Sequence, residues 1–187
     1  MINKFIRAIA AGIMIGIAGS VYLAVGPPLG AILFSLGLIL ICTREYNLYT
    51  GKIGYIKKPR EVIDMIIYIG GNALGTWFVA AIQSFDTSEM IASKLSQSWY
   101  LTLFKAIGCG LLMYIAVDIY KNNKTYWGII TCIPAFILAG FEHSIADMFY
   151  IFCAKNYSYQ TLIFITIVLI GNAIGANLYR ISKIIKI

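Results

Sequence analysis

Six long apolar segments, separated by short polar links, make up most of this chain. They fall at about 5–25, 29–50, 61–83, 99–120, 126–153 and 159–182. Each is close to or longer than the roughly 20 mostly apolar residues that a helix needs to cross the hydrocarbon core of a bilayer. The pattern therefore predicts an all-α membrane protein with six transmembrane helices.

Composition supports this prediction. Of the 187 residues, 60% are hydrophobic and 12% are charged, whereas a soluble domain has about 45–50% and about 25%. Six spans leave no room for a sizeable soluble domain, so an ordinary soluble enzyme is excluded. The mean hydropathy of +0.81 also excludes a disordered chain and a coiled coil.

The net charge of +7 would suggest nucleic-acid binding in a soluble protein, but here the positions of the basic residues matter more. Six crossings bring most of them to one side of the membrane: Lys4, Arg7, Lys52, Lys57, Lys58, Arg60, Lys121, Lys124, Arg180, Lys183 and Lys186. The links on the other side carry only Lys94 and Lys155. The positive-inside rule then predicts a multi-pass protein of the inner (plasma) membrane with both termini in the cytoplasm and no nucleic-acid partner.

The chain contains an internal repeat. The sequence Gly-Asn-Ala-Leu-Gly at 71–75 in the third segment recurs as Gly-Asn-Ala-Ile-Gly at 171–175 in the sixth. Because three spans is an odd number, the second half would enter the membrane the other way up, as in many transporters and channels. We expect a single transmembrane domain over 1–187, with one repeat at about 1–93 and the other at about 94–187. A chance match between two small-residue packing motifs is the alternative.

The second and fifth segments contain polar interruptions. The second continues into the polar stretch 43–51, and the fifth carries Gly140-Phe141-Glu142-His143-Ser144 and then Asp147. Polar or irregular backbone at membrane depth is tolerated where it is buried in protein or lines an aqueous cavity. Interrupted helices at corresponding positions of two halves are typical of a transport site.

These two segments resemble the formate/nitrite transporter family, pentameric channels for small monovalent anions and their acids. The similarity rests on Phe34-Ser35-Leu36-Gly37-Leu38, on Leu48-Tyr49-Thr50-Gly51 and, most specifically, on 140–146, and the Gly-Asn pairs fit as well. It implies a homopentamer in membrane lipid, with helices two and five interrupted. The permeant would be formate, nitrite, hydrosulfide or a similar anion, passing with protonation.

The resemblance also assigns roles to individual residues. It places His143 and Thr50 at the pore centre, Leu48 and Tyr49 in the broken loop, Phe34, Leu38 and Phe136 at two apolar constrictions, and Lys94 in a vestibule. It also counts Asn72 and Asn172 of the paired motifs among the pore or substrate residues. At other positions the chain departs from the family pattern: Asn47, Gly110 and Asp147 replace an acidic residue and two asparagines, and Arg44-Glu45 is foreign to the loop. These departures leave the identity of the permeant open.

His143 is the single histidine, and an ionisable group within a span marks a permeation pathway or a relay by default. We expect Glu142 to satisfy backbone groups freed at the break and Asp147 to hydrogen-bond within the protein. Either a structural ion pair or contact with the permeant fits Arg44 and Glu45.

Two other functions remain as alternatives, an aquaporin-like channel for neutral solutes and a membrane enzyme. The chain has no Asn-Pro-Ala element, no HExxH and no GxSxG. The four cysteines form no CxxC pair and fit packing roles. We therefore expect neither a metal nor a cofactor.

Overall fold

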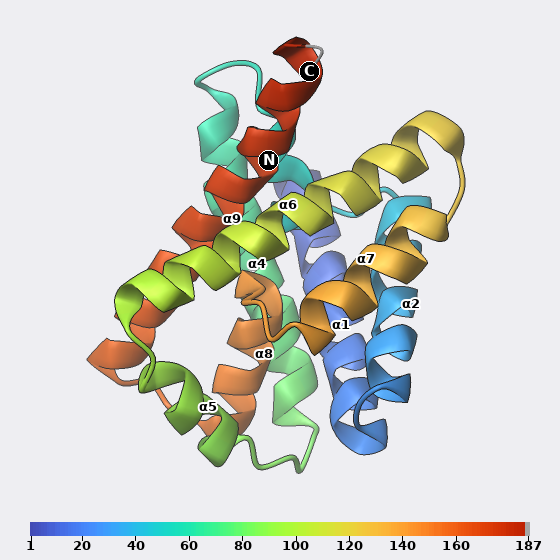
Figure 1. The fold of residues 1–187 in the computed structure, drawn as a ribbon. Helices are drawn as coiled ribbons and strands as arrows, with labels where there is room; N and C mark the ends of the chain where they lie inside the picture. The colour runs from blue at the N-terminus through green and yellow to red at the C-terminus, as the bar shows by residue number, and fades with distance from the viewer. Residues whose placement is uncertain (186–187) are drawn as a thin grey trace.

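Four long apolar helices form the frame of the protein. The structure is a computed structural model that describes residues 1–185. The long helices are α1 (Ile2–Val25), α4 (Glu61–Ala81), α6 (Trp99–Asn123) and α9 (Tyr159–Ile185), and each is long and apolar enough to cross a membrane. Residues 1–185 contain no strand, so the prediction of an all-α protein is confirmed. Figure 1 places both chain ends at the upper end of the view.

The other two apolar segments are each divided into shorter helices. The segment at 29–50 forms α2 (Leu29–Thr43) and begins α3 (Tyr49–Lys52), which a 3-10 turn (Ile53–Tyr55) follows. The segment at 126–153 forms α7 (Trp127–Leu138) and α8 (Ser144–Ala154). At 1.5 Å per residue, the 15 residues of α2 span about 22 Å, less than the roughly 30 Å hydrocarbon core.

Each division contains a residue with left-handed backbone geometry. Glu45 has φ +55° in the break at 44–48, and Gly140 has φ +67° in the break at 139–143. A left-handed residue cannot continue a right-handed helix, so each helix stops there. Both breaks lie in the two polar stretches where the sequence predicts interruptions.

One element was not expected. The link between the third and fourth apolar segments contains a short helix, α5 (Ser88–Leu95), which packs against α8 and α9. In Figure 1 this helix lies at the lower end of the view, at the opposite end from the chain termini. It carries Lys94 towards the interrupted segment α7–α8.

Glycines allow the long helices to pack in two close pairs, α1 with α4 and α6 with α9. In the first pair Gly12 lies against the carbonyl of Asn72, and Gly75 lies against the carbonyl of Ile9. The second pair repeats this arrangement, with Gly110 against Asn172 and Gly175 against Ile107. A Cβ atom at any of these glycines would collide with backbone, so the close approach of the helices depends on them.

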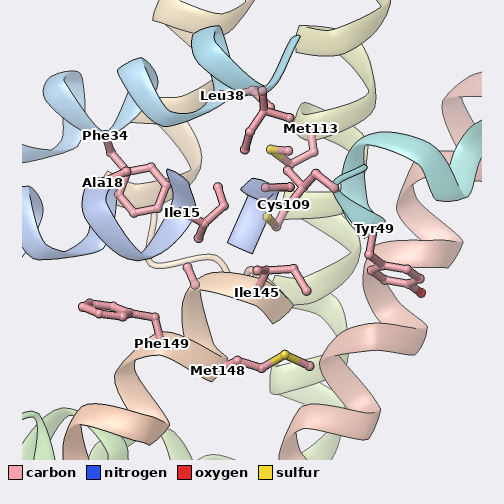
Figure 2. Close-up of a cluster of buried hydrophobic side chains, with 14 of the residues drawn as sticks. Ile15, Ala18, Phe34, Leu38, Tyr49, Cys109, Met113, Ile145, Met148 and Phe149 are labelled. Carbon is pink, nitrogen blue, oxygen red and sulfur yellow. The ribbon is translucent and has the colours of Figure 1, made fainter. Parts of the chain in front are cut away.

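Apolar side chains fill the centre of the bundle. Figure 2 shows Ile15, Leu38, Cys109, Met113 and Ile145 gathered there from α1, α2, α6 and α8. Large apolar side chains also cover the outer faces of the long helices, including Ile66, Phe78, Phe104 and Leu162. An exposed apolar exterior of this kind is what a lipid environment favours.

Candidate functional site

Asn72 of α4 holds the first break. Its Oδ1 accepts a hydrogen bond from the backbone N–H of Tyr49 (2.9 Å), and its Nδ2 donates to the carbonyls of Ala8 (2.8 Å) and Asn47 (2.9 Å). The side chain is fully buried. The side-chain amide of Asn72 therefore forms hydrogen bonds with backbone groups on both sides of Leu48 that have no partner within a helix.

Asn172 of α9 holds the second break in the same way. Its Oδ1 accepts from the N–H of Ser144 (2.9 Å), and its Nδ2 donates to the carbonyls of Ala106 and Glu142 (both 2.9 Å). The Asn172 amide thus binds the backbone on both sides of His143, as the Asn72 amide binds the backbone on both sides of Leu48. The repeat of the Gly-Asn motif was visible in the sequence, but the action of its asparagines on distant backbone was not.

His143 lies at the N-terminus of α8 and contacts the first break. Its Nδ1 accepts a hydrogen bond from the N–H of Ala146 (3.1 Å), and its Nε2 lies 2.9 Å from Oγ1 of Thr50 in α3. Because Nδ1 is an acceptor, the neutral ring carries its proton on Nε2, and this N–H group donates a hydrogen bond to the Thr50 hydroxyl. Both side chains are buried, with 2% and 1% exposure.

Four apolar side chains surround this pair. The ring of Phe136 stacks on His143, with centroids 5.7 Å apart and planes inclined by 14°. Phe34, Leu38 and Leu48 are as deeply buried as Phe136. The structure therefore brings His143, Thr50 and Phe136 into contact, and Phe34 lines the same cavity as His143 and Phe136. These residues come from helices α2, α3 and α7 and from the second break.

A cavity of about 250 Å³ lies on one side of the His143–Thr50 pair, and we call it the lysine cavity. Leu38, Leu48 and Gly51 line its inner end. Its other lining residues include the charged side chains Glu45, Lys52, Lys121 and Lys124. The basic residues outnumber the acidic one, so the lysine cavity favours anions.

A second cavity of about 180 Å³, the histidine cavity, lies on the other side. Phe34, Phe136 and His143 line it together with Lys94 and Asp147. The two cavities approach each other at the His143–Thr50 hydrogen bond. His143 lines the histidine cavity, and Leu48 and Gly51, which lie close to Thr50 in the chain, line the lysine cavity.

Lys94 is paired with two carboxylates in the histidine cavity. Its Nζ contacts Oε2 of Glu142 and lies 3.0 Å from Oδ1 of Asp147. Burial lowers the pKa of Lys94, but the carboxylates of Asp147 and Glu142 outweigh burial and raise the pKa above its usual value, so the ammonium stays charged. We refer to these three residues as the Lys94 cluster. The predicted vestibule lysine is therefore present but is not a free cation.

The expected role of Glu142 is wrong. Its side chain contacts Lys94 and accepts from Nε2 of Gln97 (3.3 Å), whereas Asn172 serves the freed backbone of the break. Asp147 bonds within the protein through one oxygen only, and its Oδ2 has no partner among the described residues. Neither contact could be expected from local sequence, because the ion pairs join residues 48 and more positions apart.

Other predicted residues bind the protein's own backbone or form structural ion pairs. Arg7 contacts both residues of the foreign dipeptide, since its Nη2 donates to the carbonyl of Arg44 (2.9 Å) and lies 3.7 Å from Oε2 of Glu45. The hydroxyl of Tyr49 donates to the carbonyl of Leu169 in α9 (3.0 Å), so this side chain anchors α3 and lines neither cavity. Asn72 and Asn172 likewise act on backbone behind the cavities.

Within residues 1–185, no three His, Cys, Asp or Glu side chains lie together as a metal site would require. The four cysteines are all free thiols. What the site offers is a buried donor and acceptor pair between two cavities of different charge.

Comparison with known proteins identifies the family. The model of the family described as "Formate/nitrite transporter" matches residues 1–181. The chain belongs to the formate/nitrite transporter family.

Two curated relatives of this formate/nitrite transporter chain are described as a formate channel and a probable formate transporter. It is 26% identical over 184 residues to "Formate channel FocA" of Haemophilus influenzae, an alignment that covers 79% of this chain and 65% of that protein. It is 28% identical over 159 residues to "Probable formate transporter" of Methanothermobacter thermautotrophicus, covering 63% of this chain and 57% of that protein. The chain thus spans less than two thirds of the length of either relative. Both are channels or transporters and not enzymes.

Solved structures share the fold of this family member. A structure described as "Pentameric formate channel with formate bound" superposes with a TM-score of 0.81 at 21% identity, covering 97% of this chain and 95% of that one. An "FNT family ion channel" gives a TM-score of 0.76 at 19% identity, covering 95% and 85%. The protein is therefore a multi-pass membrane protein with the fold of formate channels.

Proposed function

We propose that this protein is a membrane channel or transporter for small monovalent anions or their conjugate weak acids, such as formate, nitrite or hydrosulfide. The observation that carries this proposal is the buried His143–Thr50 hydrogen bond between the lysine cavity and the histidine cavity. Membership of a family of formate and nitrite transporters supports the same substrate class.

The apolar constrictions explain why protonation would accompany permeation. An unpaired anion that leaves water for the space between Phe34, Leu38 and Phe136 loses its hydration, at a cost of several kcal/mol or more. Desolvation also raises the pKa of a weak acid, because it disfavours the charged form. A permeant that takes up a proton before the constriction crosses as a neutral acid and meets a much lower barrier.

His143 suits this passage because it presents one directed donor. The Nε2–H group donates to Thr50 in the resting state, and the threonine hydroxyl can in turn donate to a permeant oxygen. The pair can therefore exchange its mutual hydrogen bond for bonds to the permeant, which keeps the buried polar groups satisfied during passage. The ring of Phe136 limits the width beside it.

The architecture we propose is six spans in two inverted repeats, with a pore inside each protomer. The matching hydrogen bonds of the Asn72 and Asn172 amides and the matching glycines of the two helix pairs support the repeat. By analogy with the solved pentameric formate channel, we propose a homopentamer. The distribution of lysine and arginine favours the plasma membrane with both termini in the cytoplasm.

A substrate panel in proteoliposomes tests the function. We expect uptake of formate, nitrite or hydrosulfide well above that of empty liposomes, with no swelling in glycerol. The matched control is His143→Asn, which keeps an acceptor for the N–H of Ala146 and removes the imidazole. Swelling in glycerol without acid uptake would favour the aquaporin-like alternative and overturn this proposal.

A further inference from the structure

The charges of the Lys94 cluster do not balance. One ammonium group contacts two carboxylates. The two acids are buried, with 1% exposure for Glu142 and 2% for Asp147, and Lys94 is half-buried, with 17% exposure. With both acids ionised the cluster would carry one net negative charge. An uncompensated charge at a buried site is strongly unfavourable, and it would repel an approaching anion.

The two carboxylates are not equally satisfied. Both oxygens of Glu142 are bonded, one to Lys94 and the other to Gln97. Asp147 bonds to Lys94 through Oδ1, whereas its buried Oδ2 has no partner among the described protein atoms. Of the two acids, Asp147 is therefore the one whose second oxygen is free to carry a proton, and it lines the histidine cavity.

This inference rests on the proposed function. We propose that Asp147 holds a proton in the resting protein and donates it to the anion that enters the histidine cavity. In this step the O–H bond of the Asp147 carboxyl breaks, and an oxygen or sulfur atom of the anion takes the proton. The products are the neutral acid and an Asp147 carboxylate paired with Lys94. Bulk water on the side from which the anion entered then returns a proton to the Asp147 carboxylate, and the hydroxide ion left behind stays in that water.

Other ionisable groups surround Asp147 on the elements packed around it. They are Tyr22 of α1, Lys94 of α5, Cys109 of α6, Glu142 and His143 of the break, and Tyr150 of α8. Lys105 of α6 reaches the Lys94 cluster only through Oε1 of Gln97 (2.6 Å). Lys94 is thus the one cation in direct contact with Asp147 among the described residues, and its charge compensates a single carboxylate.

The proton also controls access to the cavity. With Asp147 protonated the Lys94 cluster is neutral, so an anion meets no net repulsion. After transfer the cluster carries one negative charge, which disfavours a second anion until the proton returns. Entry of the anion into the histidine cavity is in this way linked to protonation of Asp147.

Infrared spectroscopy of the purified protein tests for the proton directly. Wild type should show the carbonyl band of a protonated carboxyl group at neutral pH, and Asp147→Asn should lack it. Asp86→Asn, at an exposed loop position, is the matched control and should keep the band. Absence of the band from wild type, or its persistence in Asp147→Asn, would overturn the assignment.

Transport separates this inference from the proposed function. Formate uptake by Asp147→Asn at neutral pH should fall roughly tenfold or more, since a positioned proton donor is worth about 10²–10⁴ in rate, while Asp86→Asn should match wild type. Unchanged or faster uptake in a folded Asp147→Asn protein would overturn the inference and leave the function standing. Failure of wild type to carry any weak acid would overturn the proposed function and the transfer step together.

Discussion

The Nε2 atom of His143 lies 2.9 Å from the hydroxyl oxygen of Thr50, although the two residues are 93 positions apart in the chain. The bond joins the two interrupted segments at the place where both cavities end. Among the described residues, Thr50 is the one hydrogen-bond partner of the Nε2–H group, so a change at either residue alters how a buried polar group is satisfied.

Substitutions of His143 should separate two roles of this side chain. His143→Phe removes both the donor to Thr50 and the acceptor that caps α8, so we expect loss of transport and a stability loss of about 0.5–2 kcal/mol from the cap. His143→Asn keeps a capping oxygen and should retain the thermal midpoint while transport is lost. Uptake assays with thermal unfolding in detergent measure both effects. Normal uptake by either variant between pH 5 and 8 would contradict a role of His143 in permeation.

Thr50→Val should be less well tolerated than its small volume change suggests. It leaves the buried Nε2–H of His143 without an acceptor, which costs about 1–3 kcal/mol, and it removes the hydroxyl offered to the permeant. Thr50→Ser keeps that hydroxyl and should retain uptake. We would compare thermal midpoints and formate uptake of the two variants, and equal behaviour would rule out a role for the hydroxyl.

Asn172→Ala should destabilise the protein by about 2–6 kcal/mol, because the N–H of Ser144 and the carbonyl of Glu142 at the second break lose their partner. The carbonyl of Ala106 in α6 also loses a hydrogen bond. Asn177→Ala, five residues further along α9, loses a single bond within its own helix and serves as the control. Thermal unfolding in detergent should show a much larger shift for Asn172→Ala. Similar shifts for the two variants would mean that the amide does not hold the break.

Phe136→Ala should widen the pore at the His143 ring. The side chain is 2% exposed and stacks on His143, so we expect a packing loss of about 3–5 kcal/mol. In folded protein, larger acids and chloride should pass more readily, because water could accompany the charge. Phe104→Ala, on the exposed face of α6, is the control. Wild-type selectivity in folded Phe136→Ala would place the constriction elsewhere.

The long helices were predictable because an apolar run of sufficient length determines a membrane helix by itself. The expected segment at 61–83 became α4 at Glu61–Ala81, and the segment at 99–120 became α6 at Trp99–Asn123. Helix α5 escaped prediction because half of its eight residues are polar and the helix lies in a link. Its position depends on packing against α8 and α9, which no local pattern reports.

Only the site residues that lie in recognisable sequence motifs were predictable. The resemblance singled out His143, Thr50 and Phe136, and the structure brings them into contact. The Lys94 cluster could not be derived, since adjacency in sequence says little about where Glu142 points once the backbone leaves the helix. The unpaired Oδ2 of Asp147 is a property of the packed protein alone.

The glycines that bring backbone against backbone also determine which parts of the protein can move. Gly12 and Gly75 fasten α1 to α4, and Gly110 and Gly175 fasten α6 to α9, so each pair acts mechanically as one rigid strut. Sliding one helix of a pair along the other would drive Cα atoms into carbonyl groups. Relative movement is therefore easier at unwound stretches such as 44–48 and 139–143 than within either helix pair.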